Sequence, residues 1–296
     1  MNIKYITSIG EILLDEYENE KQIGGAPFNF IYHVRKLSGN VNFISAVGND
    51  KEGKIILDFL KKENISTDYI QIRKDKPTGK VIINLNQNKI PQFDIRENAA
   101  YDFIELSAED RNKIQKESGL IYYGTLCQRN SVSQKTIHSL IKTKVPKIFD
   151  VNIRQNFYTR KILETSLKAC SILKVNEDEL NLICTIFLDT YPPFYEKVKI
   201  LMNKFKIKYL AVTKGDKGAE LFSHSESKFC RTPKCNVVDT VGAGDAYTAI
   251  LSLGIMNNID LEETNYLAVS FASEVIKQKG ALIRDEEIYD KYREKL

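Results

Sequence analysis

The sequence contains no tryptophan, only three histidines, and no long run of apolar residues. A membrane-spanning helix needs about 20 consecutive apolar residues, and no stretch of this chain has them. Charged residues interrupt positions 1–17 before an apolar segment of the signal-peptide kind can form. The sequence therefore predicts neither export nor membrane insertion.

Cysteine and histidine patterns that would bind metals are also missing. No C-x-x-C pair occurs among the five cysteines, and their odd number leaves at least one without an intrachain partner. The histidines His33, His138 and His224 are scattered without metal-ligand spacing. We therefore expect reduced thiols, a cytoplasmic location, and histidines that are structural or exposed.

The charge pattern disfavours nucleic acid as a partner. The net charge is +4, and 43 basic residues are spread among 39 acidic ones instead of forming a basic arm or stripe. With 43% hydrophobic and 28% charged residues the composition is that of an ordinary globular protein. We expect 1–296 to form one folded domain with a large core.

Short β-rich runs alternate with helical periodicity, which predicts an α/β fold with a mainly parallel sheet covered by helices. Expected strands, the last near an edge, cover 4–9, 41–47, 120–125, 147–152, 171–176, 208–214 and 218–223. Expected helices cover 26–39, 51–64, 131–144, 159–171, 177–188 and 194–206, and two more start at Ala243 and Leu261.

One region breaks this alternation. Residues 78–98 have the pattern of two strands around a polar turn, with no helix between them. With the polar segment 14–25 this hairpin could form a small sheet over one edge of the core, which would act as a lid. The residues after Gly280 are expected to be a short charged tail.

The stretch "VVDTVGAGDAYTAI" (237–250) places two glycines and an acid at a predicted helix start. Free amides at a helix N-terminus carry partial positive charge, and glycine lets an anion approach the backbone closely. Asp245 would then be placed to take a proton from a hydroxyl that attacks a phosphate. A plain helix start with a capping acid explains the pattern equally well. No P-loop motif and no G-x-G-x-x-G after the first strand are present.

Further motifs resolve this choice. The stretch at 237–247 resembles the D-T-x-G-A-G-D signature of the ribokinase-like (PfkB) carbohydrate kinases, and "GGAPFN" (24–29) resembles their N-terminal signature. Other family-like segments follow in the family's order, namely "AVGNDKEG" (46–53), "FDVNIRQNF" (149–157), "KVNEDE" (174–179) and "VTKGDKGA" (212–219). Together they cover nearly the whole chain.

The resemblance implies a role for each matching residue. Asp245 would be the catalytic base, with Gly242, Ala243 and Gly244 holding the transferring phosphoryl group and Arg154 offsetting its charge. Asp15, at the end of the first strand region, would bind sugar hydroxyls. The remaining implied sugar contacts are Gly24, Gly25, Asn29 and Asn152, together with the lid residues Arg96, Asn98 and Ala100.

For ATP the resemblance implies contacts from Asn176, Thr213, Gly215 and Gly218. Glu179 would organise Mg²⁺ through water, although the spacing of Asn176 and Glu179 is also that of a helix capping box. Asp239 would belong to a loop that binds a monovalent cation such as K⁺ in some members.

Three segments look most like fructokinases, so fructose is the first expectation for the acceptor and a homodimer through the lid is expected. Ribose, 2-keto-3-deoxygluconate or a nucleoside remain alternatives, as does a sugar-binding regulator without catalysis. The sequence departs from the family pattern at "DTV", "DVN" and 269–274, so the adenine pocket is the least defined part.

Overall fold

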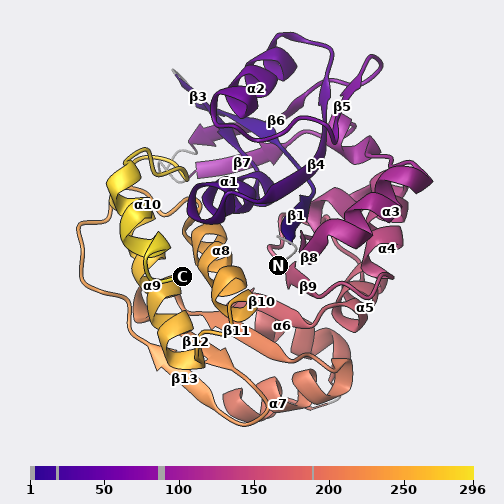
Figure 1. Ribbon diagram of the computed structural model, residues 1–296. Helices are drawn as coiled ribbons and strands as arrows, with labels where there is room; N and C mark the ends of the chain where they lie inside the picture. The colour runs from indigo at the N-terminus through magenta and orange to yellow at the C-terminus, as the bar shows by residue number, and fades with distance from the viewer. Residues whose placement is uncertain (1–3, 18–19, 86–90, 189) are drawn as a thin grey trace.

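The computed structural model describes residues 4–17, 20–85, 91–188 and 190–296. Within these ranges a nine-stranded sheet forms the centre of the molecule, in the order β13-β12-β11-β10-β9-β8-β1-β4-β5 (Figure 1). Its strands are β1 Tyr5–Ile9, β4 Val41–Gly48, β5 Ile70–Arg73, β8 Ser118–Tyr123, β9 Lys147–Asp150, β10 Ile172–Asn176, β11 Tyr209–Thr213, β12 Ala219–Phe222 and β13 Ser227–Cys230.

The central sheet is parallel from β5 to β11, and only β12 and β13 run antiparallel to their neighbours. Strand β4 is buried at every position, as expected where helices cover both faces of a sheet. The predicted α/β class with a mainly parallel sheet is confirmed. The edge strands β5 and β13 were not predicted, because they are short and half exposed.

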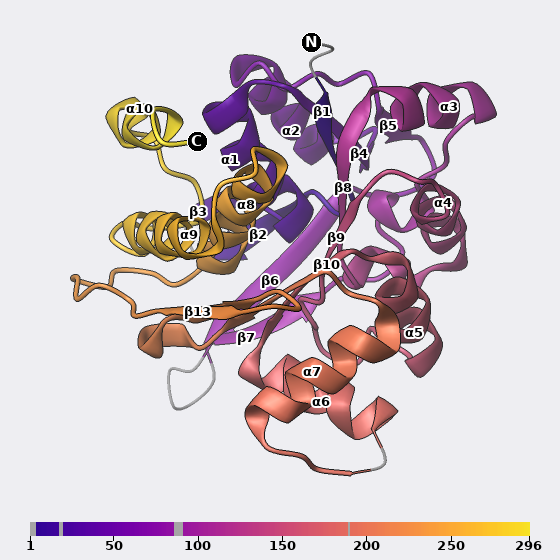
Figure 2. The same cartoon turned by 60° about the horizontal axis from the view of Figure 1, so that its bottom comes forward.

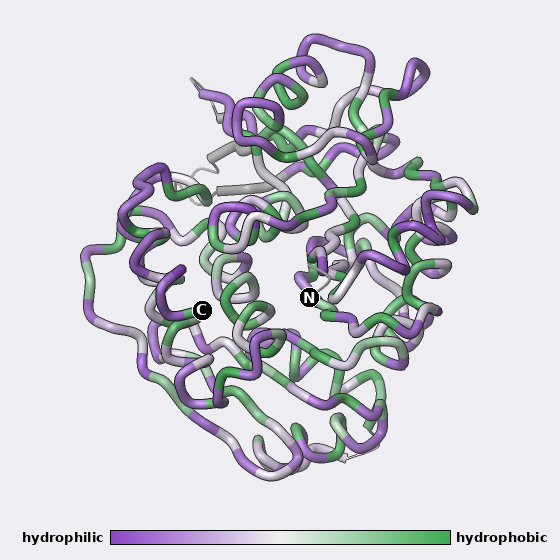
Figure 3. The backbone as a smooth tube through the Cα atoms, viewed as in Figure 1, coloured by the Kyte–Doolittle hydropathy of each residue, from purple (hydrophilic) through white to green (hydrophobic). Residues whose placement is uncertain are grey.

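Helices cover both faces of this sheet (Figure 2). One apolar core contains residues of α1, α2, α8, α9 and α10, and a second contains residues of α3 to α7. The apolar faces of the amphipathic helices account for this arrangement. Figure 3, in which the backbone is coloured by hydropathy, shows hydrophobic and hydrophilic residues alternating along the helices. The helices are α1 Ala26–Ser38, α2 Lys51–Lys62, α3 Ala108–Glu117, α4 Ser131–Ile141, α5 Arg160–Ala169, α6 Glu177–Phe187, α7 Phe194–Phe205, α8 Ala243–Met256, α9 Leu261–Val275 and α10 Glu286–Arg293.

A second, four-stranded sheet has the order β3-β2-β6-β7, with strands β2 Leu13–Tyr17, β3 Glu20–Gly24, β6 Gly79–Leu85 and β7 Pro91–Ile95. The hairpin pairs β2–β3 and β6–β7 are antiparallel, whereas β2 and β6 are parallel. This is the small sheet that the sequence predicts from 14–25 and 78–98. Residues 18–19 and 86–90 of those segments lie outside the described ranges.

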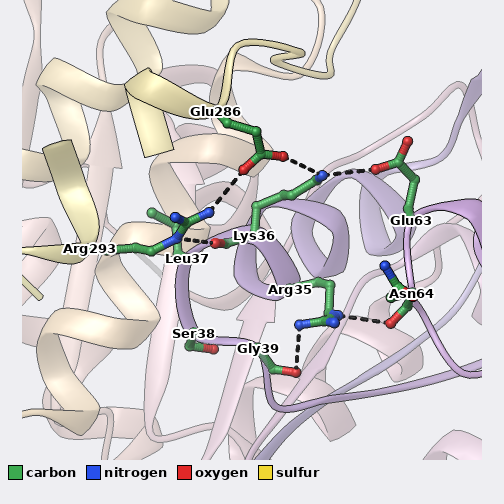
Figure 4. A pocket seen from close by; sticks show the side chains of 9 residues that line it. All are labelled: Arg35, Lys36, Leu37, Ser38, Gly39, Glu63, Asn64, Glu286 and Arg293. Carbon is green, nitrogen blue, oxygen red and sulfur yellow. Dashed lines mark hydrogen bonds and ion pairs between the residues drawn. The ribbon is translucent and has the colours of Figure 1, made fainter. Parts of the chain in front are cut away.

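The expected charged tail after Gly280 is wrong, because it contains helix α10. Tyr289 and Tyr292 are buried against the core, so the few apolar residues of this segment suffice to dock it. At the end of α1, Lys36 Nζ lies 2.9 Å from Glu63 Oε2 and 2.6 Å from Glu286 Oε1, which ties α10 to the core (Figure 4).

Helix α3 was also not predicted, and its single fully buried apolar residue, Ile114, explains why its pattern is weak. No helix in the described ranges is long and apolar enough to cross a membrane. The five cysteines are all free thiols.

Candidate active site

Helix α8 begins at the glycine-rich motif with a backbone conformation that requires glycine. Gly242 precedes the helix with φ 80°, in the left-handed region. A Cβ at this position would lie 2.3 Å from Cβ of Ala281. The turn is therefore packed closely against the segment after Gly280, and it leaves the first amides of α8 without partners inside the helix.

Asp245 lies in the first turn of α8 and is buried, with 8% of its surface exposed. Its Oδ2 accepts a hydrogen bond of 2.8 Å from Nδ2 of Asn29, on α1. Burial raises the pKa of Asp245 to about 7, and the negative charge of Asp150 adds to this effect. The hydrogen bond from Asn29 and the charges of Lys174 and Arg154 act in the opposite direction. This carboxyl can therefore take up and release a proton near neutral pH.

Arg154 is an exposed cation in the loop after β9, close enough to several carboxyls to affect their ionisation. Its charge lowers the pKa values of Asp245, Glu11 and Asp15. Burial dominates for Glu11 and Asp15 and raises their pKa values to about 7 and about 6. The structure thus brings Asp15, Arg154 and Asp245 into one electrostatic neighbourhood.

Two details differ from the sequence expectation here. Asp15 lies in the middle of β2 in the small sheet, not at the end of the first strand. Glu11, which the sequence reading did not single out, is buried with its Oε2 unpartnered. A Cβ on Gly24 would meet Asp15 Oδ2 at 2.4 Å, so a larger residue here would displace this carboxylate.

A cavity of about 620 Å³ opens at the carboxyl ends of β10 and β11, next to the start of α8. Its lining includes all four residues predicted to contact ATP and two residues of the glycine motif, namely Asn176, Thr213, Gly215, Gly218, Ala243 and Gly244. Val269, Ala272 and Ser273 of α9 form part of its wall. Carboxyl ends of parallel strands are where α/β sheets bind ligands.

Asn176 and Glu179 form the capping box that their spacing predicts at the start of α6. Glu179 also reaches outside the box, because its Oε1 accepts a hydrogen bond of 2.9 Å from the amide of Ile153. Its Oε2 accepts one of 2.9 Å from the amide of Asn176. With both oxygens so engaged, Glu179 fits a magnesium ion held through water better than one bound directly. It also fixes the loop that carries Asn152 and Arg154.

Asp239 opens the motif and connects it to the turn at Gly280. Its Oδ1 accepts from the amide of Val241 at 3.0 Å and its Oδ2 from the amide of Gly280 at 2.9 Å. The side chain therefore holds these two loops together. Among the described residues no group of three or more His, Cys, Asp or Glu side chains could hold a metal ion by itself.

The segment after β7 carries the predicted lid residues Arg96, Asn98 and Ala100. Arg96 and Asn98 are exposed, whereas Ala100 is fully buried in the core. Sequence reasoning missed the pair that anchors this segment. Arg129 makes two hydrogen bonds of 2.8 Å to the carboxylate of Asp102 and a further one to the carbonyl of Arg96.

A second buried ion pair that sequence reasoning missed lies behind the start of α8. Lys174 Nζ is 3.1 Å from Asp150 Oδ1, and the two side chains are 8% and 0% exposed. Each residue has buried apolar neighbours on both sides in the chain, Phe149 and Val151 for Asp150 and Leu173 and Val175 for Lys174, which is the signal that could have revealed the pair.

Comparison with known proteins agrees with this geometry. The family model described as "pfkB family carbohydrate kinase" matches residues 6–287. An uncharacterized sugar kinase from Pyrococcus horikoshii is 30% identical over 306 aligned positions, covering 95% of this chain and 93% of the relative. Its crystal structure superposes with a TM-score of 0.83 over 98% of both chains, and it has also been crystallised in complex with ATP.

Two plant proteins are also similar over most of this chain. The Arabidopsis thaliana protein named probable fructokinase-6, chloroplastic, is 26% identical, with 93% of this chain and 75% of that protein covered. Ribokinase of the same plant is 27% identical, with 88% of this chain and 68% of the relative covered.

Proposed function

The chain belongs to the pfkB family of carbohydrate kinases, and on this premise we propose that it transfers the γ-phosphoryl group of ATP to the hydroxymethyl group of fructose, giving fructose 6-phosphate. The observation that carries the proposal is the position of Asp245. It is a buried carboxyl with a pKa of about 7, and it directly follows Ala243 and Gly244, which line the 620 Å³ cavity. We propose one kinase domain over 1–296, with residues 14–25 and 78–98 as its lid.

The chemistry follows from the two oxygens of Asp245. Asn29 occupies Oδ2, which leaves Oδ1 to accept the proton of the acceptor hydroxyl. As that proton moves to Oδ1, the hydroxyl oxygen forms a bond to the γ-phosphorus, and the bond from phosphorus to the β,γ-bridging oxygen breaks. ADP leaves with the electron pair of the broken bond. Proton transfer to a positioned base contributes roughly 10²- to 10⁴-fold in rate.

The glycine motif supports this role by what it offers a phosphate. The amides of Gly242, Ala243 and Gly244 lie at a helix N-terminus, where partial positive charge stabilises an anion. Arg154 would add a full positive charge as the phosphoryl group moves. Asn176, Thr213, Gly215 and Gly218 would hold the rest of ATP in the cavity that they line.

Two cations are part of the proposal. Glu179 would hold Mg²⁺ through water, and the ion would supply neutralisation of charge on the β- and γ-phosphates when bound. Asp239 and the turn at Gly280 would form the site of a monovalent cation. Turnover in potassium chloride compared with tetramethylammonium chloride tests the second site, and equal rates would exclude it.

The acceptor would lie between the small sheet and the start of α8. Asp15 can accept two hydroxyl hydrogen bonds at once, which suits a vicinal diol. Gly24, Gly25, Asn29 and Asn152 would form the rest of its wall. The segment with the exposed residues Arg96 and Asn98 would close over it, and the buried Ala100 would anchor that segment in the core. Fructose is favoured over ribose and 2-keto-3-deoxygluconate by the fructokinase-like sequence of this segment.

We also propose that the chain is a homodimer through the small sheet, because β3 and β7 leave the two edges of this sheet unpaired within the described part of the chain. Sedimentation velocity tests this, and a monomer at micromolar concentration would refute it.

Two measurements test the proposed activity. Turnover of magnesium-ATP with fructose, ribose, 2-keto-3-deoxygluconate and adenosine should show the highest kcat/KM for fructose. Asp245→Asn should lower kcat by at least a hundredfold while the Tm stays near that of the wild type. Glu262→Gln is the matched control, since Glu262 is an exposed carboxylate in the first turn of α9. Retention of more than a tenth of the activity by Asp245→Asn would refute the role of Asp245 as the base. If none of the four acceptors is phosphorylated, a sugar-binding regulator would be favoured instead.

A further inference from the structure

The buried ion pair of Lys174 and Asp150 joins two neighbouring strands behind the glycine motif. The two residues occupy paired positions on β10 and β9, and Nζ of Lys174 lies 3.1 Å from Oδ1 of Asp150. Removing two charges from water costs several kcal/mol per ion, and a buried ion pair is often no more stable than apolar residues of the same volume. Stability alone is therefore a weak reason for this pair, and its neighbours suggest another.

The pair contacts α8 on both sides of Asp245. Ahead of Asp245 in the chain, a Cβ on Gly244 would lie 3.0 Å from Nζ of Lys174, so the ammonium group lies directly against the motif. One turn later, Oγ1 of Thr248 lies 3.2 Å from Oδ2 of Asp150 and 2.8 Å from the carbonyl oxygen of Gly244. These contacts fix the first turn of the helix against the sheet.

The two charges act on Asp245 in opposite directions. The negative charge of Asp150 favours the protonated form of Asp245, whereas the positive charge of Lys174 favours the carboxylate. Other charges that act on this carboxyl come from other elements. Arg154, in the loop after β9, also favours the carboxylate, and Glu11, after β1, interacts repulsively with it. Lys174 and Asp150 are distinguished by their direct contacts with α8.

We propose that Lys174 and Asp150 form a positioning pair for Asp245, which holds the first turn of α8 in place and sets the pH at which Asp245 acts as a base. Neither residue lines the 620 Å³ cavity, so the pair acts through α8 and not by touching ATP. The proposal rests on the proposed role of Asp245. It assigns to the pair a function that depends on its two opposite charges and not merely on its volume.

The test is the pH dependence of kcat/KM for Lys174→Met, Asp150→Asn and the double variant. A nearby charge commonly shifts a pKa by about one unit or more. We therefore expect the apparent pKa of the base to rise by about one unit in Lys174→Met and to fall by a similar amount in Asp150→Asn. The double variant should return close to the wild-type value, and it also covers the case in which one unpaired buried charge prevents a single variant from folding.

Lys147→Met is the matched control. Lys147 is a buried lysine at the start of the same strand, three residues before Asp150 and therefore about 10 Å away along β9. Its replacement should leave the apparent pKa of the base unchanged. Shifts of the same sign in both single variants, or no shift in either, would overturn the proposal. Activity of Asp245→Asn would instead overturn the role of Asp245 itself, so the two failures are distinguishable.

Discussion

The anchor of the lid segment provides a prediction that joins stability to acceptor binding. Arg129 holds Asp102 through two hydrogen bonds of 2.8 Å, with side chains that are 6% and 2% exposed. Its guanidinium also donates to the hydroxyl of Tyr101 and lies 4.6 Å from the ring centroid of Phe157. Arg129→Met removes these contacts and leaves the carboxylate of Asp102 buried without its counter-charge.

Breaking a buried ion pair from one side costs about 3–5 kcal/mol, a large share of the roughly 5–15 kcal/mol that stabilises a typical domain. Urea unfolding should show this loss for Arg129→Met. Because Arg129 also binds the carbonyl of Arg96, the KM for the sugar should rise at least fivefold while the KM for ATP changes less than twofold. For Arg129→Lys, both the loss of stability and the rise in the KM for the sugar should lie between those of the wild type and Arg129→Met. A lysine keeps the charge but cannot bind both oxygens in the same geometry.

The control for this prediction is Lys168→Met. Lys168 forms a helical ion pair with Glu164 in which both side chains are largely exposed, and such pairs contribute about 0.3–0.5 kcal/mol. The reasoning would be refuted if Arg129→Met cost less than 1 kcal/mol, or if the KM values for ATP and sugar rose together.

Two further predictions concern the motif and the acceptor carboxylate. Gly242→Ala should lower kcat at least tenfold, because the left-handed φ of 80° is strained for alanine and the new Cβ would meet Ala281. The control is Gly215→Ala, where φ is also left-handed but no atom lies within 4 Å of the new Cβ, so kcat should fall less. Equal losses of kcat in the two variants would contradict the packing argument. Burial raises the pKa of Asp15 to about 6, and its carboxylate form is the one that accepts sugar hydroxyls. As the pH falls below about 7, Asp245 takes up a proton, and log kcat/KM for the sugar should decline with a slope of one. Below about pH 6, Asp15 takes up a second proton, and the slope should increase to two. Asp15→Asn should keep a slope of one throughout, and a slope of two in that variant would assign the second proton elsewhere.

Most of the central sheet could be predicted from the sequence, because buried parallel strands and amphipathic helices carry strong local patterns. The capping box of Asn176 and Glu179 is equally local, since it depends only on a spacing of three residues. Helix α10 could not be predicted in this way. It has only eight residues, and its docking depends on Tyr289 and Tyr292 meeting a surface formed by distant parts of the chain.

The nucleotide side of the candidate site is a tertiary feature that the sequence could nevertheless indicate. Asn176 and Thr213 end adjacent parallel strands, and paired register places them side by side. Gly244 reaches the same cavity from a helix more than 30 residues later in the chain. Parallel strands bring their carboxyl ends to one edge of a sheet, so motifs that follow successive strands must meet there.

The pair of Lys174 and Asp150 could be predicted from the sequence only in part. Both residues lie inside strands that the sequence predicts, and each is flanked by apolar residues on a strand that must be buried on both faces. A charge in such a place favours an ionic partner, because burial without one costs several kcal/mol. Opposite charges at such positions on two strands, Asp150 on one and Lys174 on the other, therefore predict a pair, provided that the strands are neighbours in the sheet. The sequence does not specify the strand register that sets Lys174 opposite Asp150. Because side chains alternate between the two faces of a sheet, a shift of one residue would move one of the two charges to the other face and separate the pair from α8.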